Sequence, residues 1–128
     1  MPPSLAQPAP VAEDAVGDEN VEMANLRQEQ TGVPGVIFIS TRMGAHGPRV
    51  KWYEDRPLRG APSFSVDLSD PPMVVASDVD IRLQRQVAPK VATWVGLNRE
   101  ALREFWERGA ELFEDERAAL FARLRRLD

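Results

Sequence analysis

Residues 36–53 read VIFISTRMGAHGPRVKWY and contain two expected strands with the turn that joins them. Val36 to Ile39 are β-branched or aromatic, which is typical of a strand, and their unbroken apolar character predicts burial on both faces. Residues 49–53 alternate charged and apolar side chains, as a half-buried strand does. Because glycines in residues 41–48 favour a turn, the two strands are expected to form a hairpin.

Two further segments downstream are expected to extend the sheet. Residues 63–68 alternate polar residues with Phe64, Val66 and Leu68, which predicts one buried and one exposed face. Residues 73–76 form a short apolar run after two prolines, and prolines at the start of a strand favour an edge position. The sequence therefore predicts three to four strands in the first part of the chain.

Helical periodicity replaces the strand alternation from Asp78 onward. Apolar residues then recur every four positions over residues 83–95, with Asp78 as the expected N-cap. Pro89 interrupts this run, so the helix is either kinked there or divided into two. A second helix is expected over residues 99–108, with Asn98 as its N-cap.

The order of these elements, strands first and helices afterwards, predicts an α+β fold. A small antiparallel sheet of three to four strands is followed by two or three helices that pack on one of its faces. Trp94 and Phe105 are expected in the core where the helices meet the sheet. A last helix is expected over residues 115–127, and a short one over residues 20–30.

Charge divides the chain into a leader of residues 1–31 and a single domain of residues 32–128. The leader holds six acidic residues and one arginine, which leaves a net charge of −5, whereas the domain is nearly neutral. Prolines and a lack of aromatic residues predict disorder over residues 1–19. The leader is either a solvated tail or a segment that binds a partner or covers a basic surface.

Composition excludes several classes of function. The 128-residue chain has no cysteine and one histidine, His46, so disulfides, thiolate chemistry and multi-histidine metal centres are excluded. No metal and no other cofactor is expected. The sequence has no apolar run long enough to span a bilayer and no signal-peptide pattern, which predicts a cytoplasmic protein without membrane contact.

The candidate site is the turn of residues 41–48 with its flanking basic residues. It combines His46, glycine-exposed backbone amides and arginines, a combination that suits phosphate or another anion. Trp52 and Tyr53, at the end of the second strand, offer rings for stacking on exposed bases. The expected nucleic-acid- or anion-binding residues are Arg42, His46, Arg49, Lys51, Trp52, Arg56 and Arg59. The plainer interpretation is a solvated hairpin with Trp52 in the core.

Residues 94–102 read WVGLNREAL, and a further tryptophan follows one turn later. With the loop HGPRVK at residues 46–51, this pattern resembles an uncharacterised family of small bacterial proteins, over about residues 35–108. That family has a His-x-Pro-Pro-His-x-His-Val loop between strands and a helix of the form Trp-x-x-Leu-His-Arg-Glu-Glu-Leu. Arg49 and Lys51 occupy positions where the family has histidines, which favours anion binding over metal binding here. The resemblance implies one half of a two-gene operon of toxin–antitoxin type, with a partner protein.

Two functions from different classes follow. The first is a small non-enzymatic interaction or regulatory module that binds a partner protein from the same operon, with nucleic acid as a second ligand. The alternative is a small metal-independent ribonuclease-like enzyme, with His46 as the base and Arg49 or Arg42 stabilising phosphate charge. The sequence favours the first, because no nucleophile elbow, phosphate loop or dinucleotide motif accompanies His46.

Overall fold

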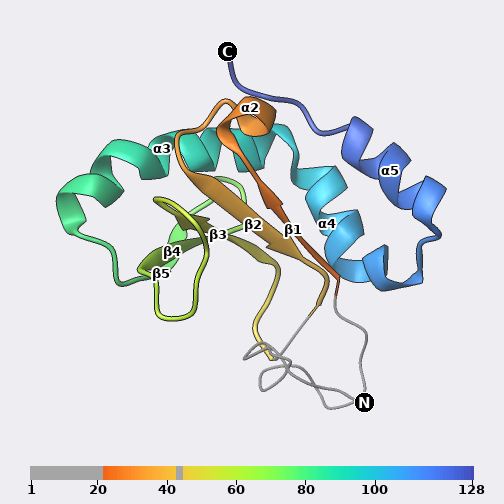
Figure 1. The fold of residues 1–128 in the computed structure, drawn as a ribbon, viewed down its shortest axis with the longest axis horizontal. Coiled ribbons are helices and arrows are strands. Elements are labelled where there is room, and N and C mark those ends of the chain that lie inside the picture. The colour runs from red at the N-terminus through yellow and green to blue at the C-terminus, as the bar shows by residue number, and fades with distance from the viewer. Residues whose placement is uncertain (1–21, 43–44) are drawn as a thin grey trace.

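The computed structural model describes residues 22–42 and 45–128, which form a five-stranded antiparallel sheet with helices on one side (Figure 1). The strands follow one another across the sheet in chain order. The elements are β1 (Met23–Leu26), α2 (Gln28–Thr31), β2 (Val36–Ser40), β3 (Arg49–Tyr53), β4 (Ser63–Asp67), β5 (Val74–Ser77), α3 (Ile81–Leu97), α4 (Arg99–Arg108), the short 3₁₀ helix η2 (Gly109–Glu111) and α5 (Glu114–Ala122). The predicted α+β fold is confirmed, and the sheet has five strands rather than three to four.

Alternation along the strands decides which face of the sheet is buried. Ile37 and Ile39 on β2 and Trp52 on β3 point into the core, each with 2% or less of its surface exposed. Their neighbours along the strands point to the opposite face, where Phe38 is only half-buried. The expected burial of residues 36–40 on both faces is therefore wrong at Val36 and Phe38, because the helices cover one face alone, whereas Ser40 at the end of the strand is buried.

The longest helix in the described residues is α3, which packs against the buried face of the sheet with α4. It begins after Asp80, whose carboxylate accepts a hydrogen bond from the Arg82 N–H at 3.1 Å, and not after Asp78 as expected. It continues through Pro89, so the periodic run is one helix and not two. None of the helices described is both long enough and apolar enough to cross a bilayer.

The junction of α3 and α4 is fixed by buried residues. Trp94 and Phe105 are 1% and 0% exposed, which confirms their expected place in the core. Asn98 lies at the start of α4, but its side chain does not cap that helix as expected. Its Nδ2 donates to the carbonyl oxygens of Trp94 at 3.0 Å and Arg125 at 2.9 Å, and its Oδ1 accepts from the Arg125 N–H at 2.7 Å. The buried Asn98 thus holds the C-terminal segment against the helix layer.

The helix expected over residues 115–127 is α5, and it ends at Ala122. The residues that follow bond to another segment instead of continuing the helix. The Leu127 N–H donates to the Thr31 carbonyl oxygen at 2.8 Å, which joins the C-terminal segment to α2. This contact is between residues far apart in sequence, which is why helical periodicity alone overestimates the length of α5.

The N-terminal part of the domain is the main correction to the sequence prediction. Residues 23–26 form the edge strand β1 rather than part of a helix over residues 20–30, because they pair along their whole length with β2. Leu26 and Thr31 are buried, so the domain includes these residues and the predicted boundary after residue 31 is wrong. The predicted disorder of residues 1–19 lies outside the residues that the structure describes.

Candidate nucleic-acid interface

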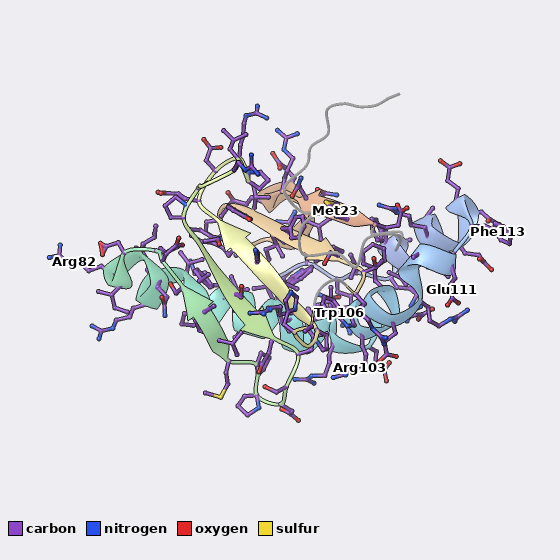
Figure 2. All side chains as sticks on the ribbon, turned by 90° about the horizontal axis from the view of Figure 1, so that it is seen from below. Met23, Arg82, Arg103, Trp106, Glu111 and Phe113 are labelled. Carbon is purple, nitrogen blue, oxygen red and sulfur yellow. The ribbon has the colours of Figure 1, made fainter. Side chains whose placement is uncertain are left out.

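One face of the sheet carries no helix in the described part of the chain (Figures 1 and 2). The register places one row of side chains across all five strands on this face, from Asn25 on β1 through Phe38 and Lys51 to Ser65 and Ala76. We call this the open face, and its members are Asn25, Val36, Phe38, Arg49, Lys51, Tyr53, Ser63, Ser65, Asp67 and Ala76.

Two aromatic rings lie half-buried on adjacent strands of the open face. Phe38 on β2 is opposite Lys51 on β3, and Tyr53 is two residues further along β3. Burial raises the pKa of Tyr53, and the nearby Asp78 carboxylate raises it further, whereas a hydrogen bond with Ser63 lowers it. The Tyr53 phenol is therefore neutral at physiological pH and offers a ring and a hydroxyl without charge.

Phe38 is a functional candidate that sequence reasoning missed. It lies between Ile37 and Ile39 in an apolar run. Because the whole run is apolar, the sequence does not show that the Phe38 side chain points away from the core. The signal that identifies Phe38 is its pairing with Lys51, whose outward orientation follows from the clear alternation of residues 49–53. Strand pairing therefore gives the orientation of the Phe38 side chain, which local composition does not.

Three of the expected basic residues come together on the open face. His46, Arg49 and Lys51 line a shallow depression of about 440 Å³, whose remaining walls are Ser63, Ser65, Ala76, Ser77 and Asp78. Arg49 and Lys51 are two residues apart on β3, so both side chains point outward, with their Cα atoms about 7 Å apart. Neither cation has an ion-pair partner among the residues described.

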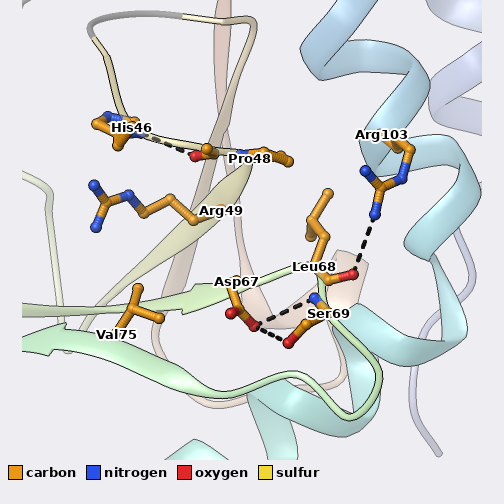
Figure 3. Close-up of a pocket in the computed structure, with 9 residues that line it drawn as sticks. His46, Pro48, Arg49, Asp67, Leu68, Ser69, Val75 and Arg103 are labelled. Carbon is orange, nitrogen blue, oxygen red and sulfur yellow. Dashed lines mark hydrogen bonds between the residues drawn. The ribbon is translucent and has the colours of Figure 1, made fainter.

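The loop of residues 41–48 between β2 and β3, which we call the His46 loop, also borders a second hollow, of about 420 Å³, where β3 begins and β4 ends (Figure 3). Its walls include Asp67 and Arg103, and Arg103 donates a hydrogen bond to the Leu68 carbonyl oxygen at 3.3 Å. The His46 Nδ1 lies 2.9 Å from the carbonyl oxygen of the next residue, and its ring centroid is 5.5 Å from that of Trp106. The imidazole is thus held at the border between the two hollows.

Asp67 lies opposite Arg49 in the register, but its carboxylate is bound to the turn before β5. It accepts hydrogen bonds from the Ser69 hydroxyl at 2.6 Å, the Ser69 N–H at 3.3 Å and the Met73 N–H at 2.9 Å. Burial alone would raise the pKa of Asp67, but these hydrogen bonds outweigh burial and lower it. The ionised carboxylate therefore stabilises the turn, and it forms no ion pair with Arg49.

Trp52 does not belong to the candidate interface. Its side chain is 1% exposed, its indole N–H donates to the Pro34 carbonyl oxygen at 2.6 Å, and its ring stacks on Phe64 with the centroids 5.1 Å apart. The predicted stacking of Trp52 on a base is therefore wrong, because no face of the indole is free. The plainer interpretation, in which Trp52 is a core residue, is confirmed.

Arg56 and Arg59 are exposed on the loop between β3 and β4, at the opposite end of β3 from His46. The surface expected over residues 42–59 is therefore not continuous, since a whole strand separates its two ends. Arg42 is exposed at the end of β2, and its backbone N–H donates to the Trp106 carbonyl oxygen at 2.8 Å. Of the expected residues, Arg42, His46 and Arg49 lie at one end of the sheet, and Lys51 lies two residues further along β3.

No family model, no curated protein and no solved structure matches this chain. The family resemblance and the operon partner that it implies stay predictions. The two motifs behind the resemblance lie in different places. Residues 94–102 form the junction of α3 and α4, with Trp94 and Leu102 buried, whereas residues 46–51 border the open face. Across the described residues, no group of three histidine, aspartate or glutamate side chains is placed to hold a metal ion.

Proposed function

We propose that the chain is a non-enzymatic module that binds single-stranded nucleic acid on the open face. The observation that supports this proposal is the placement of two aromatic rings, Phe38 and Tyr53, beside Arg49 and Lys51 on the helix-free face of an antiparallel sheet. Aromatic rings stack on bases, and each stacked base is worth about 1–3 kcal/mol. The two cations supply contacts to the backbone phosphates.

The arrangement suits a single strand better than a duplex. Base faces are hidden in a duplex because they stack on one another, whereas sheets that recognise RNA present their aromatic rings to unstacked bases. Lys51 lies directly opposite Phe38, so a base stacked on Phe38 has its own phosphate within a nucleotide's length of the Lys51 ammonium.

The acidic residues near the open face indicate the path of a bound strand. Asp67 is the last residue of β4 and Asp78 directly follows β5, whereas Arg49 and Lys51 lie on β3. Because a polyanion avoids the carboxylates and follows the cations, the strand is expected to cross β2 and β3.

The test is a titration of a labelled single-stranded oligonucleotide with the full chain, followed by fluorescence anisotropy at about 50 mM salt. Lys51→Glu is expected to weaken binding strongly. Lys90→Glu makes the same change of charge on an exposed residue of α3, in the helix layer, and is expected to leave binding unchanged. No binding by the parent chain, or an equal loss in the two variants, would overturn the proposal.

A protein partner is the second candidate, and the open edge of the sheet at β5 favours it. Val75 on β5 is 50% exposed, and Met73, directly before β5, is 59% exposed. The other edge strand, β1, is contacted by α5, because Arg117 donates to the Met23 carbonyl oxygen at 3.1 Å. Exposed apolar residues along the outer side of an edge strand are a typical place for a partner to add a strand. Co-expression with the product of the neighbouring gene tests this: co-purification is expected, and Val75→Lys is expected to abolish it. A complex that forms equally well with Val75→Lys does not use this edge.

A further inference from the structure

The chain enters the sheet beside the open face. The Glu22 N–H donates to the Thr41 Oγ1 at 3.1 Å, and the Thr41 N–H donates to the Glu22 carbonyl oxygen at 2.9 Å. Residues before Glu22 are therefore attached at the end of the sheet where the His46 loop begins. From Met23, Lys51 is two residues along the strands and two strands across, a distance of about 12 Å.

The cations at this end of the sheet lack partners among the described residues. The ion pairs among all the described residues join Arg99 to Asp70, Arg108 and Arg123 to Glu104, and Arg117 to Glu22. None of them uses Arg42, Arg49 or Lys51. Glu22, the one acidic residue of the described segment before β1, is bound to α5 and does not reach the open face.

Residues 13–19 read EDAVGDE and hold four acidic residues within seven positions. Glu19 is three residues from Glu22, and Glu13 is nine, so an extended chain spans about 10 Å and about 30 Å respectively. Both Arg49 and Lys51 are within that reach. The charge of residues 13–19 is opposite to that of the cations, and attachment at Glu22 leaves the cations within reach of the segment.

We infer that residues 13–19 occupy the open face and pair with Arg49 and Lys51. Because the segment is part of the same chain, its effective concentration at the face is on the order of millimolar, which compensates for the weakness of each exposed ion pair. The same weakness leaves the segment displaceable. Given the proposed function, on which only this consequence depends, the segment competes with nucleic-acid phosphates and lowers their apparent affinity by a few fold.

The two lysines of the chain allow a direct test, because Lys51 is on the open face and Lys90 is on α3. A carbodiimide joins an amine to a carboxylate only when the two are in contact. Treatment of the full chain at low salt, followed by trypsin and mass spectrometry, is expected to join residues 13–19 to Lys51 and not to Lys90. Salt at about 0.5 M is expected to suppress this cross-link, since it screens exposed charges. Equal yields at the two lysines, or no cross-link from residues 13–19, would overturn the inference.

A second measurement separates this inference from the proposed function. The quadruple variant Glu13→Gln, Asp14→Asn, Asp18→Asn and Glu19→Gln is compared with a variant that neutralises four exposed acidic residues of the helix layer, namely Glu100, Glu107, Glu111 and Glu114. Only the first is expected to bind the oligonucleotide several fold more tightly than the parent. A cross-link to Lys51 without any oligonucleotide binding keeps the inference and removes the proposed function. Oligonucleotide binding that the two quadruple variants change equally contradicts the inference alone.

Discussion

Phe38 and Lys51 lie directly opposite each other on β2 and β3, on the face of the sheet that no described helix covers. The phenyl ring contributes stacking and apolar contact, and the ammonium contributes charge. Under the proposed function, only the charged contribution depends on salt, so the contributions of the two residues to the free energy of nucleic-acid binding can be measured separately.

Phe38→Ala is expected to weaken binding of a single-stranded oligonucleotide by about 1–3 kcal/mol for the base that it stacks, by a similar amount at every salt concentration. Lys51→Gln is expected to reduce the slope of log K against log salt by about 0.7, the value for one phosphate contact on a single strand. Both are measured by anisotropy over a series of salt concentrations. Phe38→Leu, which keeps the residue apolar, controls for loss of packing. A slope that changes with Phe38→Ala but not with Lys51→Gln would contradict this division.

Arg49→Gln and Arg56→Gln make the same change at opposite ends of β3. Arg49 lines the depression on the open face, whereas Arg56 is on the loop beyond it. Arg49→Gln is therefore expected to lower affinity for all sequences alike, because phosphate contacts do not distinguish bases, and Arg56→Gln is expected to have little effect. An equal loss in the two variants would restore the continuous surface predicted over residues 42–59.

Local sequence predicts the strands and helices whose periodicity is strong, and it fails where long-range pairing decides. Alternation alone predicts strands over residues 49–53 and 63–68, and the structure has β3 over Arg49–Tyr53 and β4 over Ser63–Asp67. Residues 23–26 have little periodicity of their own and become a strand because β2 offers an unpaired edge. A deletion of residues 1–31 would therefore remove the edge strand β1, which lies within the predicted leader.

The residues of the candidate site divide in the same way: local sequence predicts some of them, and others are evident only from strand pairing. The sequence predicts Arg49 and Lys51 as site residues, because charged residues next to a glycine-rich turn suggest an anion site. It predicts Trp52 on the same surface, but the alternation that turns Lys51 outward turns Trp52 into the core. It does not identify Phe38, since the outward orientation of this residue is evident only from its pairing with β3.

Trp94→Ala and Phe105→Ala are each expected to lower the free energy of unfolding by about 3–5 kcal/mol, because both side chains are buried between the sheet and the helices. Phe113→Ala is the matched control, since Phe113 is 75% exposed and projects from the end of the helix layer (Figure 2). That variant is expected to change stability by less than about 0.5 kcal/mol. Urea denaturation measures all three, and an unshifted Trp94→Ala midpoint would show that Trp94 is not a core residue.

Asp67 gives the fold a dependence on acid pH. Hydrogen bonds from Ser69 and Met73 lower its pKa in the folded protein, so its contribution to stability is present above the pKa of the unfolded chain, about 3.9. That contribution is lost as the pH falls through the lower, folded-state pKa. Asp67→Asn is expected to be less stable than the parent at pH 7, with a difference that narrows toward pH 3. A difference that stays constant with pH would assign the loss to packing instead of charge.

The ribonuclease alternative makes a prediction that differs from that of a binding module. It requires His46 to act as a base, with Arg49 stabilising the phosphate, and both residues line the depression on the open face. As a binding module, the chain is expected to bind RNA without cleaving it in the presence of a metal chelator, and its overexpression is expected to be harmless. His46→Ala is expected to change affinity only modestly.

The decisive variant is therefore His46→Ala, measured for binding and for cleavage on the same labelled RNA. A binding module loses some affinity in this variant and shows no cleavage before or after the change. An enzyme shows cleavage that His46→Ala abolishes while RNA binding is retained, because the base acts on the reaction and not on the phosphate contacts. The second result, with growth inhibition that the same substitution relieves, would replace the binding module with an enzyme whose site is the His46 end of the open face.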